Sequence, residues 1–198
     1  MKTLRVRITF TEPVLGTASS NPEVHREYIA SKAPDAQTAE EEVASIGVDA
    51  SVQKQTTVFP RMPGGGPMLW DYQLKGFFKD ASSAMRQVPG TKSEKVKAHK
   101  KIIDGTVFVF PRRMPLLLPS GKQLSRCERP LRAQTAQGER VALAASEEAP
   151  AGTSFDCEIR ILRDSDEPWI RELLDYGALR GIGCWRNSGK GRFSWILA

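Results

Sequence analysis

The hydrophobic pattern of the chain predicts four strands. Residues 2–10 alternate strictly between apolar and polar side chains, which is typical of a strand with one buried face. Residues 153–163 alternate in the same way. Shorter apolar stretches at 105–110 and 192–197 predict two further strands. These four segments are the expected strands of the core.

Two helices are expected between these strands. From Asp71 to residue 87 the apolar residues recur every three or four positions, and Asp71 is the expected N-cap. That stripe consists of Leu74, Phe77, Phe78, Ala81 and Met85. A second apolar stripe at 167–179 follows Asp166, which is expected to cap its helix. The predicted order of the core elements is therefore β-α-β-β-α-β.

Three segments do not fit this order. We expect them to be insertions into a single domain that covers residues 1–198. They lie at about 11–70, 88–104 and 111–152. No internal repeat and no clean linker divides the chain further.

Local signals predict the structure of each insertion. Asn21, Pro22 and Glu23 begin a helix that ends near Lys32, and a second short helix and a strand are expected at 38–47 and 55–59. The lysine-rich residues 92–101 predict a helix that faces solvent. The third insertion holds five prolines, spread over 111–150, so we expect short strands and loops there.

Basic residues are concentrated in one part of the chain. The 198 residues include 29 Lys and Arg against 23 Asp and Glu, a net charge of +6. Residues 86–132 hold twelve of these cations and only three of the acids, so the remainder is slightly acidic. Such segregation favours phosphate binding, because each neutralised phosphate releases counterions. The alternative is a solvated basic segment without a partner.

Cysteine spacing and hydropathy exclude several classes of protein. Cys127, Cys157 and Cys184 are odd in number and never form a C-x-x-C pair. They therefore predict neither a closed disulfide framework nor a Cys-rich zinc site, and this usage is typical of the reducing cytoplasm. No apolar run approaches the roughly 18 residues of a membrane span, so no membrane partner is expected.

A glycine-rich segment between the second helix and the last strand is the main candidate site. This glycine loop, residues 181–192, interleaves four glycines with Arg186, Lys190 and Arg192. Backbone N–H groups and cations together can bind an anion. Dinucleotide and Walker loops follow a strand and open a helix, whereas this loop does the reverse, so no nucleotide cofactor is expected. A glycine-rich connection without a ligand is the alternative.

The motif from Gly181 to Phe193 is Gly-x-Gly-x-Trp-Arg-x-Ser-Gly-x-Gly-Arg-Phe. It resembles the glycine-rich loop of the RAMP superfamily, the RNA-binding proteins of CRISPR systems with ferredoxin-like, RNA-recognition-motif-like domains. Residues 72–79 resemble the Ser-Leu-Lys-Gly segment of CRISPR backbone subunits, with Gln73 in place of the serine. The resemblance covers about half of the chain, and the pattern is also similar to solitary phage and prophage members. It implies an α+β, ferredoxin-like core, which the predicted element order fits.

The resemblance also implies where a nucleic acid would lie, namely along the sheet face and the glycine loop. The basic residues 88–132 would extend a flap over it, and Trp70, Tyr72 and Trp185 are candidates for stacking on bases. Trp195 is expected to be a core residue. The expected nucleic-acid contacts are Lys75, Arg112, Arg113, Trp185, Arg186, Asn187, Lys190 and Arg192, with the loop glycines Gly181, Gly183, Gly189 and Gly191.

Many RAMP proteins cleave RNA, and some use a histidine as general acid and base without a metal. This chain has two histidines. His25, beside Arg26 and Tyr28, is the catalytic candidate, and an exposed helix histidine is its alternative. His99 lies among lysines and is expected to be solvated. No cluster of ligand residues has the spacing of a metal site, so no metal or other cofactor is expected.

Three functions follow as hypotheses. The first is a cytoplasmic, non-enzymatic protein that binds RNA or single-stranded DNA, with CRISPR-type subunits or its own copies as further partners. Such a protein, which a phage could carry, would either join a CRISPR complex or interfere with one. The second is a metal-independent RNA endonuclease that uses His25. The third is an adaptor or inhibitor that docks on an acidic protein.

Overall fold

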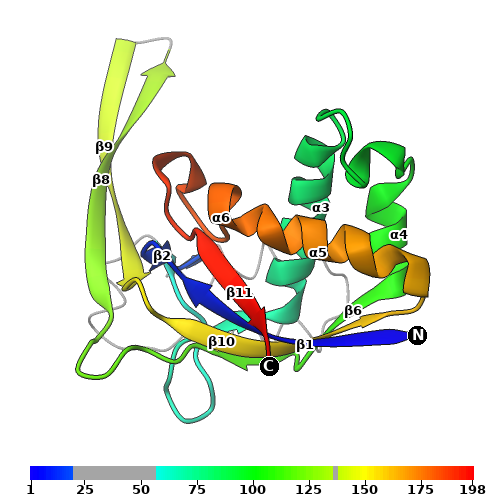
Figure 1. The fold of residues 1–198 in the computed structure, drawn as a ribbon. Helices are drawn as coiled ribbons and strands as arrows, with labels where there is room; N and C mark the ends of the chain where they lie inside the picture. Colours follow the sequence, from blue (N-terminus) through cyan, green and yellow to red (C-terminus); the bar gives the residue numbers. More distant parts are fainter. Residues whose placement is uncertain (20–56, 136–137) are drawn as a thin grey trace, which may run out of the picture.

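A four-stranded antiparallel sheet forms the centre of the molecule (Figure 1). The computed structural model describes residues 1–19, 57–135 and 138–198. The sheet has the order β11-β1-β10-β6, and helix α3 (Asp71–Met85) and helix α5 (Glu167–Asp175) connect its strands along the chain. The bounds of the strands are β1 Lys2–Phe10, β6 Val107–Phe110, β10 Ser154–Ile161 and β11 Phe193–Leu197. The predicted α+β, ferredoxin-like class is confirmed.

The core lies between the sheet and these two helices, which cover one face of it (Figure 1). Strand alternation explains the packing, since Val6 and Ile8 are buried while Arg5 and Arg7 point to the opposite, open face. Burying a side chain of this size contributes roughly 1.5–3 kcal/mol each. The helices contribute Leu74, Phe77, Phe78, Ala81, Trp169, Ile170, Leu173 and Leu174.

The helix starts agree with the expectation at one cap and differ at the other. Trp70 occupies the N-cap of α3, so Asp71 is the first helical residue, and the N–H of Trp70 donates to the side-chain oxygen of Gln73 at 2.7 Å. In the second helix Asp166 is the N-cap, as expected, but its carboxylate accepts from Arg163 at 2.8 Å and bonds no helix N–H. The expected cap at Asp71 was wrong because α3 begins one residue earlier, where the side chain of Gln73 bonds the backbone of Trp70.

The second predicted helix ends early. A short helix, α6 (Gly177–Arg180), follows α5, which stops at Asp175. A Cβ on Gly177 would lie 2.1 Å from the ring of Phe193, so glycine is required where α6 crosses strand β11.

A second sheet carries a hairpin that projects from the body (Figure 1). The expectation of short strands and loops at 111–150 was wrong there, because Pro130 lies inside a long strand and pairs with Leu143. A proline is tolerated at this point, since that strand pairs on one side only among the described residues. The strands of this sheet are β2 Val14–Leu15, β3 Ala18–Ser19, β4 Thr57–Val58, β8 Ser125–Thr135 and β9 Gly138–Ala149.

Two smaller features complete the description. Strand β5 (Met68–Trp70) pairs with β7 (Arg113–Pro115) as a separate ribbon. Strand β4 lies within the strand expected at 55–59. The helices expected at 22–32 and 38–47, and with them His25, lie outside the described residues.

The lysine-rich residues 92–101 are not one helix. A single turn, η2 (Ser93–Lys95), is followed by helix α4 (His99–Thr106). The backbone N–H groups of Lys92 and Ser93 donate to the Glu172 carboxylate at 2.6 and 3.0 Å, and this contact with α5 replaces the helical pattern. No helix in the described ranges is long and apolar enough to cross a membrane.

His99 is buried, so the expectation of a solvated side chain was wrong. Its Nε2 lies 2.9 Å from the Ser83 hydroxyl, and its Nδ1 lies 3.2 Å from the Arg86 guanidinium. Since the guanidinium can only donate, Nδ1 accepts and the ring is neutral. Burial, and after it the charges of Arg86 and Lys100, lower the pKa of His99 below its ordinary value. His99 therefore attaches α4 to α3.

Candidate nucleic-acid interface

The four glycines of the glycine loop allow it to fold against itself. All four have positive φ, between 73° and 93°. The N–H of Ile182 donates to the Gly191 carbonyl at 2.9 Å. A Cβ on Gly191 would lie 1.8 Å from the Ile182 carbonyl oxygen, and one on Gly181 would lie 2.5 Å from the Gly191 backbone. The glycines at 181 and 191 are therefore required by the approach of one part of the loop to the other.

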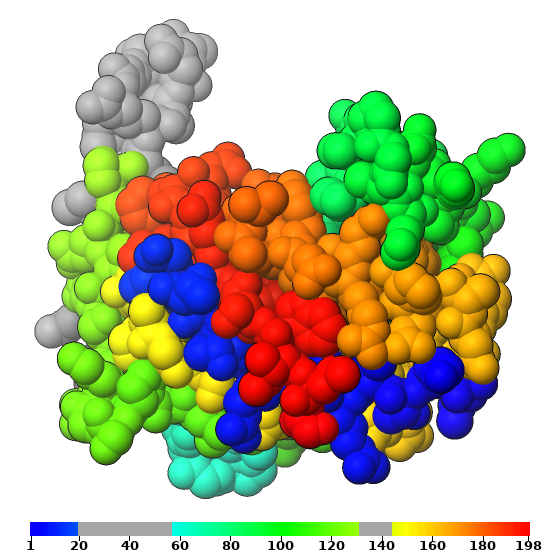
Figure 2. Space-filling model, in the orientation of Figure 1, coloured from blue at the N-terminus to red at the C-terminus, as the bar shows by residue number. Residues whose placement is uncertain are grey.

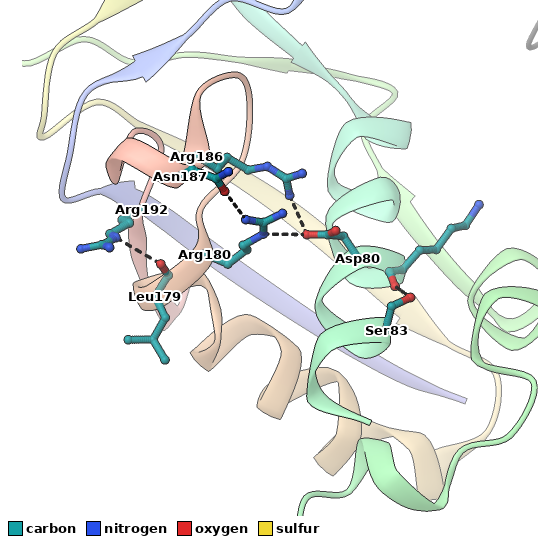
Figure 3. A network of polar contacts seen from close by, with 8 residues as sticks. Asp80, Ser83, Leu179, Arg180, Arg186, Asn187 and Arg192 are labelled. Carbon is teal, nitrogen blue, oxygen red and sulfur yellow. Dashed lines mark hydrogen bonds and ion pairs between the residues drawn. The ribbon is translucent and has the colours of Figure 1, made fainter. Parts of the chain in front are cut away.

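The cations of the glycine loop bond to three different elements, and Figure 3 shows the contacts of Arg186 and Arg192. Arg186 pairs with Asp80 of α3 at 2.6 Å, and Lys190 pairs with Glu148 of β9 at 2.6 Å. The Arg192 side chain donates to the carbonyl of Leu179 in α6 at 3.1 Å. These contacts fasten the loop to the body of the protein. The phosphate-binding role assigned to these residues stays a prediction.

Asp80 is shared by two arginines. Arg180 approaches it at 3.1 Å in addition to Arg186, and Arg180 also donates to the Asn187 side chain at 2.9 Å (Figure 3). Partial burial alone would raise the pKa of Asp80, but the two arginines outweigh it and lower the pKa below the ordinary value. The carboxylate is therefore charged, and one positive charge in this cluster is left uncompensated.

Among the charged side chains with a known contact to the loop, cations outnumber carboxylates. Arg129 of β8 lies with its guanidinium 5.2 Å from the ring centre of Trp185. Five cations belong to the loop or contact it, whereas the carboxylates that contact it are those of Asp80 and Glu148. The five cations are Arg129, Arg180, Arg186, Lys190 and Arg192. This surplus is the kind of local field that attracts a polyanion.

Trp185 is presented at the surface of the loop. Its side chain is 42% exposed, and its backbone has φ 55°, in the left-handed region that non-glycine residues rarely adopt. The N–H and the hydroxyl of Ser188 hold this turn by donating to the Trp185 carbonyl at 3.1 and 2.9 Å. Such a conformation costs on the order of 1–3 kcal/mol, and strain of this kind concentrates at functional sites.

The other aromatic candidates differ from Trp185. Trp70 is 1% exposed, so the expectation that it stacks on a base was wrong. Tyr72 is exposed and lies parallel to Trp70, with ring centres 6.3 Å apart. Trp195 packs against the core and donates its indole N–H to Asp175 at 2.9 Å, in agreement with the expected core role.

Lys75, Arg112 and Arg113 lie away from the loop cations. The Lys75 ammonium donates to the Asp104 carbonyl at 3.2 Å and lies 5.2 Å from the ring centre of Phe108. Burial is the main cause that lowers the pKa of Lys75. Arg112 and Arg113 lie over the Trp70 ring, at 5.3 and 5.7 Å. These three predicted contacts form a separate group near the start of α3.

The basic residues 88–132 do not form one flap, contrary to expectation. In Figure 2 the part around α4 (green) is a protrusion on one side of the molecule, and the part in β8 (yellow-green) lies on the opposite side. The division arises because strands β6 and β7 run between the two parts.

Residues 92–101 of the first part are called here the lysine segment. Its exposed lysines have no ion pair with any residue that the structure describes. They are Lys92, Lys95, Lys97, Lys100 and Lys101.

The open face of the central sheet is nearly neutral. Arg7 binds Asp156 through two hydrogen bonds of 2.7 Å, and Glu158 accepts from both Arg5 and Arg160. An exposed aromatic, Phe110, lies under the Arg160 guanidinium at 4.4 Å. Within residues 1–19, 57–135 and 138–198 there is no cluster of three or more potential metal ligands.

The sequence did not reveal three residues of the interface, namely Asp80, Arg129 and Arg180. Asp80 lies 100 positions from Arg180 and 106 from Arg186, and no local pattern connects residues so far apart. Arg129 was counted only as one of the cations of the basic stretch.

Comparisons with known proteins show the fold. No protein-family model matches the chain, and no curated protein matches it. A solved chain of "Type III-B Cmr-beta bound to cognate target RNA" is similar, with a TM-score of 0.52 and 13% identity. The similarity covers 98% of this chain and 59% of that one, so this chain spans little more than half of that relative's length. A chain of a "Type IV-B CRISPR Complex" has a TM-score of 0.50 and 11% identity, with coverage of 100% and 90%.

Proposed function

We propose that this protein binds single-stranded RNA and does not cleave it, as a RAMP-type relative of the subunits that form the backbone of CRISPR complexes. Two findings support the proposal at the level of fold. Similar solved chains come from CRISPR complexes, and one of those complexes is bound to target RNA. The motif that suggested the RAMP superfamily also forms a surface loop in this fold.

The observation that carries the proposal is Trp185. An indole that is 42% exposed, held in a strained turn and covered by the Arg129 guanidinium, offers a base one flat face beside positive charge. Stacking of one base on an aromatic side chain contributes about 1–3 kcal/mol, whatever the base. The surplus of cations around the loop would hold the adjoining phosphates. RNA would therefore run past the tip of the glycine loop.

A pair of variants tests this proposal. We expect Trp185→Ala to weaken the binding of a short single-stranded RNA about tenfold in fluorescence anisotropy, since one stacked base is lost. The matched control is Phe110→Ala, because Phe110 is also exposed, at 40%, and also lies under an arginine, but on the open sheet face. The affinity of Phe110→Ala for the same RNA should differ from that of the wild type by less than about twofold.

The reverse result, a loss of affinity in Phe110→Ala alone, would move the interface to the open sheet face. No binding by the wild-type protein would reject the function itself. Thermal melting of both variants checks that each has folded.

A further inference from the structure

A pocket of about 300 Å³ lies between α3 and the glycine loop. One wall is the side of α3 that carries Tyr72, Gly76 and Asp80, which follow one another at a spacing of four residues. The opposite wall contains Gly183 and Arg186 of the loop. Figure 3 shows Arg186 reaching from the loop to Asp80 of the helix at one side of this space.

Gly76 is an unusual residue for this wall. It occupies the interior of a 15-residue helix, where glycine is the least favourable residue after proline. Its backbone does not have the positive φ that would require glycine. A Cβ built on it would meet nothing within 4 Å in the described part of the chain. The described structure therefore gives no reason for a glycine here, except that a side chain would occupy the pocket.

The pocket walls suit a flat and uncharged ring. Tyr72, Phe77 and Ile182 supply aromatic and aliphatic surface. Polar groups lie among them, since the side chains of Gln73 and Thr17 are joined by a hydrogen bond of 2.6 Å.

The charges of the pocket argue against a phosphate. Asp80, the carboxylate that lines the pocket, is shared by Arg180 and Arg186. Arg186, the cation that lines the pocket, is therefore already bonded within the protein and is not free to bind a phosphate there. The combination of apolar faces and polar groups matches a nucleobase, which has flat faces and hydrogen-bonding edges but no charge.

We propose that this pocket receives a single base of the bound strand, and that Gly76 keeps the space for it open. The inference rests on the proposed function, because the pocket adjoins the proposed stacking residue. Arg186 belongs to the glycine loop and also lines the pocket, and Trp185 immediately precedes Arg186 in the chain. One base stacks on Trp185 outside the loop, and a second enters the pocket beside Tyr72. The site thus binds the strand by its bases as well as by its phosphates.

Filling the pocket tests the inference. Gly76→Leu places a side chain in the space where the base is expected. The matched control is Gly105→Leu in α4, because Gly105 is also helical, has no positive φ and has no neighbour within 4 Å of its built Cβ. Leucine favours a helix more than glycine does, so both variants should melt no lower than the wild type.

Fluorescence anisotropy with a labelled single-stranded RNA then separates the outcomes. Gly76→Leu is expected to weaken binding about tenfold, whereas Gly105→Leu should stay within about twofold of the wild type. Equal affinity of Gly76→Leu and the wild type would overturn the pocket and leave the proposed function standing. A wild-type protein that binds no RNA would overturn both.

A second probe distinguishes a base from the backbone. An oligonucleotide of the same length, in which abasic units replace the nucleotides, keeps the phosphates and lacks the bases. Measured at low salt, the effect of Gly76→Leu should disappear with this probe, so that variant and wild type bind it equally. An equal loss of affinity for both probes would mean that the pocket holds backbone, and the assignment to a base would be wrong.

Discussion

The glycine loop and the lysine segment are both rich in cations, but they use them differently. In the loop, Arg186, Lys190 and Arg192 each have a partner within the protein. In the lysine segment, the five exposed lysines have no ion pair with any described residue. Counting charges along the chain gives no sign of this difference.

The comparison suggests that the glycine loop and the lysine segment contribute to RNA binding in different ways. A cation that is already paired must give up its partner before it can neutralise a phosphate, so it adds little net attraction. A solvated lysine has no such cost and releases counterions when a phosphate binds. We therefore expect the loop to supply shape, stacking and the local attraction of its uncompensated charge, while the lysine segment supplies most of the salt-dependent attraction.

Gly191→Ala should have the largest effect of the variants discussed, because it adds a side-chain atom where the backbone of the loop is most closely packed. The new Cβ would meet the Ile182 carbonyl at 1.8 Å, at φ 73°. We expect the free energy of unfolding in urea to fall by about 3 kcal/mol or more. Gly189→Ala is the control, since φ is also positive there but its nearest contact is 3.6 Å, and it should cost about 1–2 kcal/mol. Equal losses would contradict the packing described.

Neutralising the lysine segment should have the second largest effect, on affinity and not on stability. We expect replacement of Lys97, Lys100 and Lys101 by glutamine to weaken RNA binding about tenfold at moderate salt. The slope of log affinity against log salt should also decrease by about 2, since each phosphate contact to a single strand contributes about 0.7. The free energy of unfolding should change by less than about 0.5 kcal/mol per site.

The open sheet face provides the control for this variant. Replacing Arg5, Arg7 and Arg160 by glutamine removes the same charge, but from arginines that are already paired with Asp156 and Glu158. The salt dependence should then change less than it does in the lysine variant. If the two variants have equal slopes, total charge and not pairing controls binding.

His99 should give the smallest effect, visible as a dependence of stability on pH. Its folded pKa is lowered, so the unfolded chain binds the proton more readily. The stabilisation is therefore complete above the ordinary histidine pKa of about 6.5 and is lost as the pH falls below it. Urea unfolding at about pH 7.5 and about pH 5 should show a loss on the order of 1 kcal/mol or less that is reduced in His99→Gln. An undiminished loss in that variant would exclude His99 as its source.

The sequence predicted the core because burial there is periodic. Alternation through Val6 and Ile8, and again through Cys157 and Ile159, is a local signal that a sheet with one covered face imposes. The turn η2 in the lysine segment could not be predicted in this way. The backbone of Ser93 there donates to Glu172, which lies 79 positions away.

The candidate site was predictable only in part. Trp185 and the loop glycines stand out in the sequence because their residue types are unusual together. The partners of the loop cations do not, since Asp80 and Glu148 belong to other elements. The open space over Gly76 requires the packing of α3 against the loop, which no sequence pattern specifies.

The proline in strand β8 has a consequence for behaviour at high concentration. An eleven-residue strand such as β8, which has one unpaired edge among the described residues, is a ready template for growth into fibrils or amorphous aggregates. Pro130 lacks the N–H that a neighbouring strand would need, and the exposed charges of Arg126 and Glu128 also disfavour docking of a strand. The projecting hairpin is thereby protected against self-propagating assembly.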